Sequence, residues 1–292
     1  MENKFPDSEL ILNPDGSVYH LNLLPEDISD TVITVGDPDR VSVVSKFFDR
    51  IELKKQKREF ITHTGIYKGK RITVLSTGIG TDNIEIVFNE LDALVNIDLK
   101  KRIPKEKTTS LRIIRIGTSG ALQADIPTDA FVFSLFGLGF DGLMNFYDHQ
   151  NTSDENDLLE SFISHFGNFK KIARPYLYAS SSELEKTISD GMVKGITATC
   201  PGFYAPQGRV LRYRLEFPDF LEKLNSFRSK DLRITNFEME TSAMCGLASL
   251  LGHKTCSVNA IVANRFNKNH TKNAERTMDN MIETVLTRLS KS

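Results

Sequence analysis

The sequence predicts a single α/β domain, because short apolar runs alternate along the chain with longer segments of helical periodicity. The 292 residues are 40% hydrophobic and 26% charged, which is the composition of an ordinary globular protein and excludes disorder and fibrous repeats. This length is ample for a sizeable core. No segment rich in Ser, Gly or Pro divides the chain, so we expect one domain over residues 1–292.

Seven apolar runs are the candidate strands, and most of them are followed by glycine or proline. The first reads as a buried strand that ends in a tight turn at Gly36-Asp37-Pro38-Asp39-Arg40. The runs span residues 31–35, 60–67, 71–76, 111–116, 130–136, 193–199 and 256–262.

Three segments have helical patterns. Asp82 and Glu85 form a candidate capping pair for an amphipathic helix that packs on the sheet. Residues 237–251 are apolar on nearly every side, which predicts a deeply buried helix. Residues 274–289 carry one apolar stripe and predict a surface helix, whereas the polar stretch 148–157 is typical of a loop insertion.

Composition also restricts the compartment and the partners. Lys+Arg 37 against Asp+Glu 38 give a net charge of −1, which offers no general attraction to nucleic acid. Cys200, Cys245 and Cys256 form no CxxC pair and lie among apolar neighbours, so we expect buried thiols in a reducing compartment. With neither a leader-like N-terminus nor a membrane-length apolar run, the sequence predicts a cytoplasmic protein.

Several common catalytic signatures are missing from the sequence. The match to GxGxxG at 137–142 lacks the following helix and the acidic residue of a dinucleotide site, so we interpret it as a glycine-rich turn. The P-loop, HExxH and GxSxG patterns are absent, and the six histidines lack ligand spacing. We therefore expect neither a metal nor a cofactor.

Three glycine-rich turns at strand ends each lie beside an arginine or a small hydroxyl side chain, at 36–40, 77–81 and 115–120. Glycine lets backbone N–H groups approach an anion, and a guanidinium offers a planar fork to phosphate oxygens. Taken singly, each turn could be a simple connection. Arg115 is different because it lies inside an apolar run, where its charge needs a partner or a bound anion.

Two further constellations carry polar groups next to apolar ones. Glu238 and Glu240 lie at the predicted start of the buried helix, where each needs a hydrogen-bond donor; ligand hydroxyls and the helix dipole are equally good explanations. In the loop 200–209, Phe203 could stack on a planar ring while Gln207 and Arg209 recognise its polar edge.

Together these motifs resemble the nucleoside phosphorylase-I family, and within it the uridine phosphorylases. The resemblance runs from Tyr19 to Arg265 and depends on several motifs in order, with residues 1–18 as an N-terminal extension. It implies a mixed, twisted central sheet that forms a partial barrel flanked by helices. The motifs are GDPDRV at Gly36, REF at Arg58, STGIG at Ser76, RIGTSG at Arg115, FYxxQGR at Phe203 and FEMET at Phe237.

The resemblance also implies a role for each matching residue. Phosphate would be held by Gly36, Arg40, Arg115 and Thr118, with Arg58 supplied by a neighbouring subunit. Ribose would be held by Met239 and Glu240, supported by Glu238, with His20 reaching its 5′-hydroxyl across the subunit interface. The base would be held by Phe203, Gln207 and Arg209, and Arg115, Gln207, Arg209 and Glu240 would form the catalytic set.

The implied reaction is the reversible phosphorolysis of uridine to uracil and ribose 1-phosphate, in a homodimer or hexamer with shared active sites. Purine-cleaving relatives carry an aspartate near Asn264-Arg265, and asparagine cannot donate a proton as that acid does, which favours pyrimidines. Thymidine, deoxyuridine or a 5′-modified nucleoside stay open as substrates, as does a structural monovalent cation near Glu59. The alternatives are a purine nucleoside phosphorylase, a nucleosidase and a non-catalytic nucleoside-binding protein.

Overall fold

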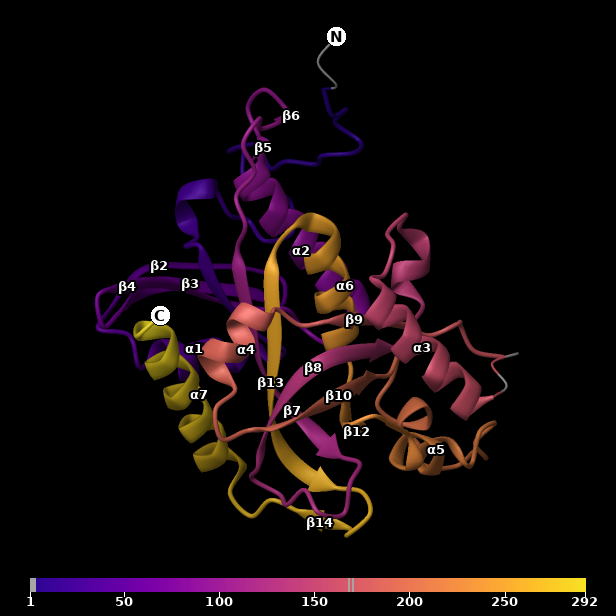
Figure 1. Cartoon of the computed structure of the whole chain (residues 1–292). Helices are drawn as coiled ribbons and strands as arrows, with labels where there is room; N and C mark the ends of the chain where they lie inside the picture. Colours follow the sequence, from indigo (N-terminus) through magenta and orange to yellow (C-terminus); the bar gives the residue numbers. More distant parts are fainter. Residues whose placement is uncertain (1–3, 168, 170) are drawn as a thin grey trace.

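A computed structural model describes residues 4–167, 169 and 171–292 (Figure 1). Residues 1–3 of the predicted N-terminal extension lie outside this range. A twelve-stranded sheet dominates the fold. Its strands are β1 (Thr31–Val35), β2 (Arg50–Lys57), β3 (Phe60–Tyr67), β4 (Lys70–Ser76), β7 (Arg112–Ala121), β8 (Phe131–Gly139), β9 (Tyr176–Ala179), β10 (Val193–Thr199), β11 (Arg228–Ser229), β12 (Leu232–Glu238), β13 (Lys254–Asn264) and β14 (Asn269–His270). A separate hairpin pairs β5 (Ile97–Asp98) with β6 (Ile103–Pro104).

Part of the sheet closes on itself. Along the path β12-β10-β8-β13-β7 each strand pairs with the next, and β12 also pairs with β7, so these five strands form a small barrel. The remaining strands β1, β4, β3 and β2 extend the sheet outward from β7. Parallel and antiparallel pairs are mixed, since β7 runs parallel to β1 and β13 but antiparallel to β12. The predicted α/β class with a mixed, partly barrel-like sheet is confirmed.

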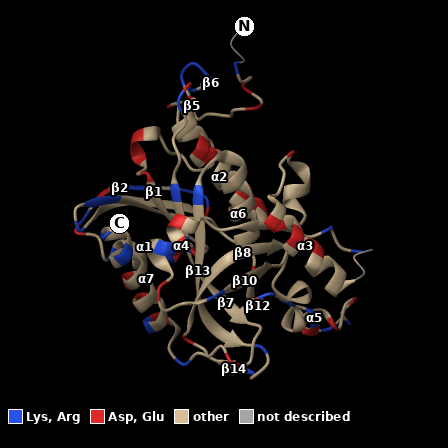
Figure 2. Cartoon of the chain, in the orientation of Figure 1, with Lys and Arg blue, Asp and Glu red and all other residues tan. Residues whose placement is uncertain are grey.

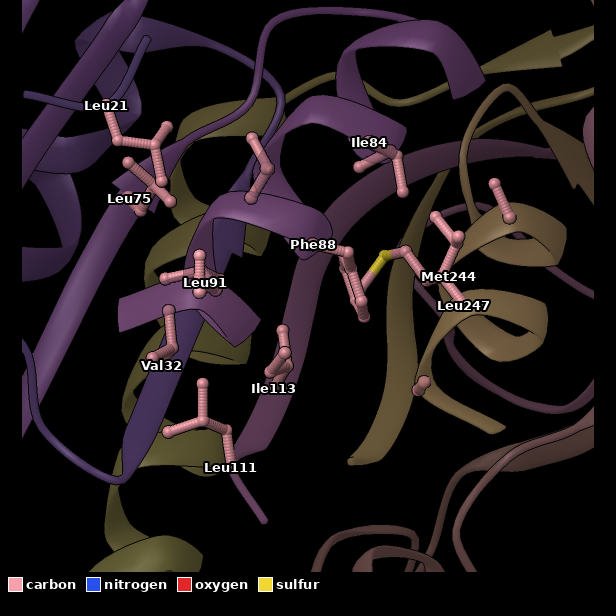
Figure 3. Packing of buried hydrophobic residues seen from close by; sticks show 14 of the residues in the cluster. Leu21, Val32, Leu75, Ile84, Phe88, Leu91, Leu111, Ile113, Met244 and Leu247 are labelled. Carbon is pink, nitrogen blue, oxygen red and sulfur yellow. The ribbon is translucent and has the colours of Figure 1, made fainter. Parts of the chain in front are cut away.

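Helices cover the sheet (Figure 1). On one side α2 and α6 form one hydrophobic cluster with residues of β1, β4 and β7, α6 packs also against β8 and β13, and Phe88 and Met244 meet between the two helices (Figure 3). On the other side α1, α4 and α7 pack against alternate residues of the same strands. A third cluster joins α3 and α5 to the barrel strands. The helices are α1 (Pro38–Ser45), α2 (Thr81–Asn96), α3 (Ser153–Phe166), α4 (Ser182–Ile188), α5 (Phe220–Ser226), α6 (Thr241–Leu251) and α7 (Ala274–Ser290).

The charged surface and the buried thiols are those of an ordinary globular protein. Acidic and basic residues are interspersed on outer helices such as α7 (Figure 2). All three cysteines are buried and free, as predicted, and burial raises the pKa of the Cys200 thiol. Within the described part of the chain, no helix has both the length and the apolar character needed to cross a membrane.

One predicted glycine turn is wrong because it lies within a strand, and a second, at 137–142, is only partly correct because it begins inside a strand and turns at Gly142, where φ is positive. The segment 115–120 continues β7 to Ala121, and Gly137 and Gly139 lie inside β8. A Cβ at Gly139 would lie 2.4 Å from the ring of Tyr176, so this glycine serves close packing rather than a turn. The turns at 36–40 and 77–81 are confirmed, and the second contains Gly78 and Gly80 at positive φ.

Three predictions about helices also need correction. The predicted capping pair is wrong: α2 is capped by Gly80 without a side-chain bond, and Glu85 instead accepts from Asn89 and Tyr147. The buried helix begins at Thr241, because the preceding residues to Glu238 extend as β12. The polar stretch 148–157 is a loop only up to its capping residue Thr152, where α3 begins.

We predict that Gly137→Ala lowers the free energy of unfolding by about 1–3 kcal/mol, which is the usual cost of overpacking. A Cβ there would lie 2.6 Å from the Cα of Ser242, so β8 and the start of α6 would have to separate. Urea denaturation measures the change. Ser164→Ala, a substitution at an exposed position of α3, is the control and should leave the stability close to that of wild type; equal stability of Gly137→Ala and wild type would contradict this packing.

Candidate active site

A cavity of about 910 Å³ lies where β1, β4 and β12 end and where β7 passes into the barrel. Ligand sites of α/β proteins commonly lie at such strand ends. From the predicted phosphate group, Gly36, Arg40, Arg115 and Thr118 line the cavity. From the predicted ribose and base groups it is lined by Phe203, Gln207, Arg209, Glu238, Met239 and Glu240. The structure therefore brings together motifs more than 200 residues apart in sequence.

Two predicted residues lie outside this cavity. Arg58 is exposed in the turn between β2 and β3. His20 lines a different hollow, where its Nδ1 lies 2.7 Å from Oε1 of Glu90. Glu90 also accepts hydrogen bonds from the backbone N–H groups of His20 and Leu21, which fixes the ring beside it. Both residues were expected to act on a neighbouring subunit's site, and that expectation stays a prediction.

The centre of the cavity is a buried ion pair. Nη2 of Arg115 donates to Oε2 of Glu240 at 2.5 Å, and the two residues are only 6% and 3% exposed. Oε1 of Glu240 accepts from the backbone N–H of Gly80, which belongs to the second glycine turn. Burial alone would lower the pKa of Arg115, but the carboxylates of Glu240 and Glu238 outweigh it and raise that pKa. Arg115 therefore remains charged inside an apolar strand, as its position required.

Glu238 is held by a second set of donors. Its carboxylate accepts from Oγ1 of Thr199 at 2.7 Å and from the backbone N–H groups of Glu240 and Thr241. It lies 3.6 Å from Nη2 of Arg115. These contacts place the carboxylate of Glu238 beside the N-terminus of α6, so the helix terminus, Thr199 and Arg115 all stabilise its charge. The pKa of Glu238 is raised to about 7, chiefly by burial. The charge of Arg115 opposes this rise and the charge of Glu240 adds to it.

One side of the cavity is suited to an anion. Gly36 and Asp37 lead into α1, so the positive end of this helix dipole faces the same space as Arg40. Burial lowers the pKa of Arg40, and the nearby charge of Arg115 lowers it further. Two guanidinium groups that disfavour each other's charge are a favourable place for an anion, which relieves their repulsion.

The loop after β10 carries an aromatic ring, an amide and a guanidinium group. Gln207 is buried, and its Oε1 accepts from Nη1 of Arg209 at 2.7 Å. The guanidinium of Arg209 lies 3.7 Å from the ring centre of Phe203 and covers one face of that ring. Nη1 of Arg265 donates to the backbone carbonyl of Gln207 and so helps to hold the loop in place.

The structure changes the interpretation of Asn264, which was used above to favour pyrimidines. Its Nδ2 donates to the backbone carbonyls of Gln123 and Ile126, and its Oδ1 accepts from Phe266 and Asn267. The side chain therefore ties the loop between β7 and β8 to the turn between β13 and β14, and Asn264 does not line the cavity. Asn264 gives no direct evidence about the base.

Sequence reasoning assigned no site role to several polar or charged residues of this region. Glu59, Asn83 and His270 line the cavity, and Asn259 bonds to Arg115. Glu59 was considered only as a neighbour of a cation. Among the described residues, no three His, Cys, Asp or Glu side chains are grouped as metal ligands. Asn259 had a detectable signal, since an amide inside the apolar run 256–262 needs partners just as Arg115 does.

Comparison with known proteins identifies the family. Residues 30–291 match the phosphorylase superfamily, and the chain belongs to it. The uridine phosphorylase of Thermococcus kodakarensis is 29% identical over 276 residues, covering 94% of this chain and 88% of that protein. A DeoD-type purine nucleoside phosphorylase of Buchnera aphidicola is 26% identical, covering 92% of this chain and 98% of its own.

Solved structures agree with this assignment. A Trypanosoma brucei nucleoside phosphorylase, described as showing uridine phosphorylase activity, superimposes with a TM-score of 0.85 at 28% identity. The match covers 97% of this chain and 100% of the other. The nucleoside phosphorylase fold that the motifs implied is confirmed.

The pKa of Glu238 gives a testable dependence of stability on pH. Its pKa is raised from an ordinary 4.5 to about 7, so between these values the unfolded chain loses the proton while the folded protein keeps it. The free energy of unfolding should therefore fall as pH rises from about 4.5 to 7, by a few kcal/mol at most. Urea denaturation across this range should show a shallower decline for Glu238→Gln.

The control for this experiment is Glu160→Gln, which changes an exposed carboxylate paired with Arg174. This variant should follow the wild-type curve. Identical pH profiles for wild type and Glu238→Gln would show that the carboxyl group is not perturbed by its burial.

Proposed function

We propose that this chain, a nucleoside phosphorylase, catalyses the reversible phosphorolysis of uridine to uracil and ribose 1-phosphate in pyrimidine salvage. The observation that carries the proposal is the Arg115–Glu240 ion pair, which joins an anion-binding region to a carboxylate within one cavity. The enzyme is accordingly a pentosyltransferase that needs no protein nucleophile, because phosphate itself attacks the sugar.

Phosphate is assigned to the region of Gly36, Arg40, Arg115 and Thr118. Arg115 still has N–H donors for the phosphate oxygens, because its contacts with Glu240 and Asn259 use only two of the five N–H groups of its side chain. Arg40, which lies on α1, and the N-terminus of that helix add positive potential to the same region. Attack by phosphate requires that the anion be held close to the sugar carbon. Arg115 is suited to hold it there because the same side chain also contacts Glu240, which is assigned to the ribose.

Ribose is assigned to Met239 and Glu240, supported by Glu238. As the glycosidic bond breaks, positive charge develops on the sugar, and carboxylates already fixed beside it stabilise that charge without reorganisation. Glu240 has one oxygen on Gly80 and one on Arg115 but retains lone pairs that accept from ribose hydroxyls.

The base is assigned to Phe203, Gln207 and Arg209. Uracil leaves with negative charge, so hydrogen-bond donors from an amide and a guanidinium stabilise its departure. Gln207 can both donate and accept, which suits the adjacent carbonyl and N–H groups of a pyrimidine edge. Donors of this kind contribute roughly 10²–10³ in rate each.

A neighbouring subunit is assigned the two remaining roles. His20 and Arg58 lie outside this chain's cavity, and shared sites would let His20 reach the 5′-hydroxyl and Arg58 the phosphate of a second protomer. The proposed assembly is therefore a homodimer, or a hexamer built from such dimers.

The test of substrate and reaction is ultraviolet-monitored cleavage of uridine and of inosine, each with and without inorganic phosphate. We expect loss of uridine only when phosphate is present, with ribose 1-phosphate as the co-product. Cleavage of inosine instead would reassign the base site to purines. Cleavage without phosphate would indicate a nucleosidase, and tight binding of uridine without turnover would indicate a binding protein.

Arg115→Ala should abolish phosphate-dependent release of uracil, with a loss of at least 10²–10³ in turnover. The change also leaves Glu240 buried without its cation, so circular dichroism must confirm that the variant folds. Arg115→Lys keeps the charge without the planar fork and should retain only part of the activity. Arg174→Ala, which removes an exposed ion pair, is the matched control. Undiminished turnover in Arg115→Ala would rule out the phosphate assignment.

A further inference from the structure

Arg115 lies on β7 where this strand pairs with β13, and the pairing brings four residues together on one patch of the sheet. Arg115 lies opposite Ser257, and Gly117 lies opposite Asn259. Residues two apart on a strand point to the same face, so these four residues share one side of the two strands. The patch forms part of the barrel wall, since β7 and β13 are both barrel strands.

The side chain of Arg115 crosses its own strand at Gly117. A Cβ added to Gly117 would lie 1.7 Å from Nη1 of Arg115 and 2.5 Å from its Cζ. Only glycine leaves room for the guanidinium at this point. The guanidinium thereby reaches Asn259, the residue directly across from Gly117.

Asn259 fixes the guanidinium group on this side. Its Oδ1 accepts from Nη1 of Arg115 at 2.8 Å, and its Nδ2 donates to Oγ of Ser257 at 3.0 Å. Asn259 is 0% exposed, so neither contact competes with bulk water. The bond to Ser257 orients the amide with its oxygen toward Arg115.

The two contacts of Arg115 differ in charge. Glu240 binds Nη2 and balances the positive charge, whereas Asn259 binds Nη1 with a neutral amide. A carboxylate at position 259 would be a third acid around Arg115, beside Glu238 and Glu240. The neutral acceptor holds the plane of the guanidinium and leaves its remaining N–H groups positive enough to attract an anion. Nε of Arg115 is one such group, being buried without a partner among the described residues.

We propose that Asn259 is a positioning residue that sets the affinity for phosphate by fixing the Arg115 guanidinium across Gly117 without neutralising it. The inference rests on the phosphate assignment of the proposed function. It assigns to the middle of β13 a role that none of the sequence motifs included.

The experiment is calorimetric titration of inorganic phosphate into the full-length protein without nucleoside, followed by measurement of kcat and KM for phosphate with uridine. Asn259→Leu removes the acceptor at similar volume and should weaken phosphate binding about tenfold or more, as expected for a lost hydrogen bond to a charged group. KM for phosphate should rise by a larger factor than kcat falls.

Two further variants separate positioning from structural support. Asn259→Asp keeps an acceptor for Arg115 but adds negative charge, so it should fold and still bind phosphate more weakly than wild type. Thr255→Val removes a buried hydrogen bond to the carbonyl of Ile113 between the same two strands, away from the cavity, and should leave phosphate binding within twofold of wild type.

The outcomes are distinguishable. If wild type binds phosphate and folded Asn259→Leu binds it equally well, the positioning role is wrong while the proposed function stands. Should Asn259→Leu fail to fold, unchanged phosphate affinity in Asn259→Asp contradicts the proposal in the same way. Equal weakening in Thr255→Val would reduce Asn259 to a structural role. Absence of phosphate binding in wild type would overturn the phosphate assignment itself.

Discussion

The buried contact between Arg115 and Glu240 is the interaction on which the rest of the site depends. Removing two charges from water costs several kcal/mol each, and the cost is offset only when the geometry is good and the remaining donors and acceptors are used. Here the barrel provides that geometry. Arg115 comes from β7 and Glu240 follows β12, and these strands meet because Phe237 pairs with Gly120 where the barrel closes. Without this closure the two charges would lie at opposite ends of the path β12-β10-β8-β13-β7.

The balance of charges around the contact between Arg115 and Glu240 relates it to the proposed phosphorolysis. Glu238 and Glu240 face Arg115, and Arg40 adds a second cation at the edge of the cavity. An incoming phosphate would satisfy the two arginines, whereas the positive charge that develops on a ribose would be stabilised by the two acids. On the proposed assignment each subsite would favour the charge that the other one supplies, and Arg115 would contact both ligands. In this proposal a single arginine, bonded to a neutral amide and to a carboxylate, would couple the two subsites at short range.

Much of the fold could be predicted from local pattern, and the exceptions have a common physical cause. The strands 31–35, 60–67 and 193–199 agree with the structure at both ends, because apolar runs bounded by polar or turn residues are a local signal. Glycines in β7 and β8 were interpreted as turns, but they are demanded by neighbours distant in sequence. Gly117 makes room for Arg115, and Gly137 for the backbone of Ser242. Such tertiary demands leave no local pattern that separates them from a turn.

The same distinction explains what the sequence could say about the site. Most of the site residues predicted from the ordered motifs do line the cavity. The motifs succeed because they combine residue types that are costly to bury unpaired, such as Arg115 and Glu240. An isolated amide gives a weaker signal, and its partners decide its meaning. Asn264 satisfies four backbone groups in two neighbouring loops and so serves the fold, whereas Asn259 bonds to the guanidinium of Arg115, which is the contact behind its proposed role in the site. The two amides lie five residues apart on one strand, and only the contacts of each side chain separate a structural role from a functional one.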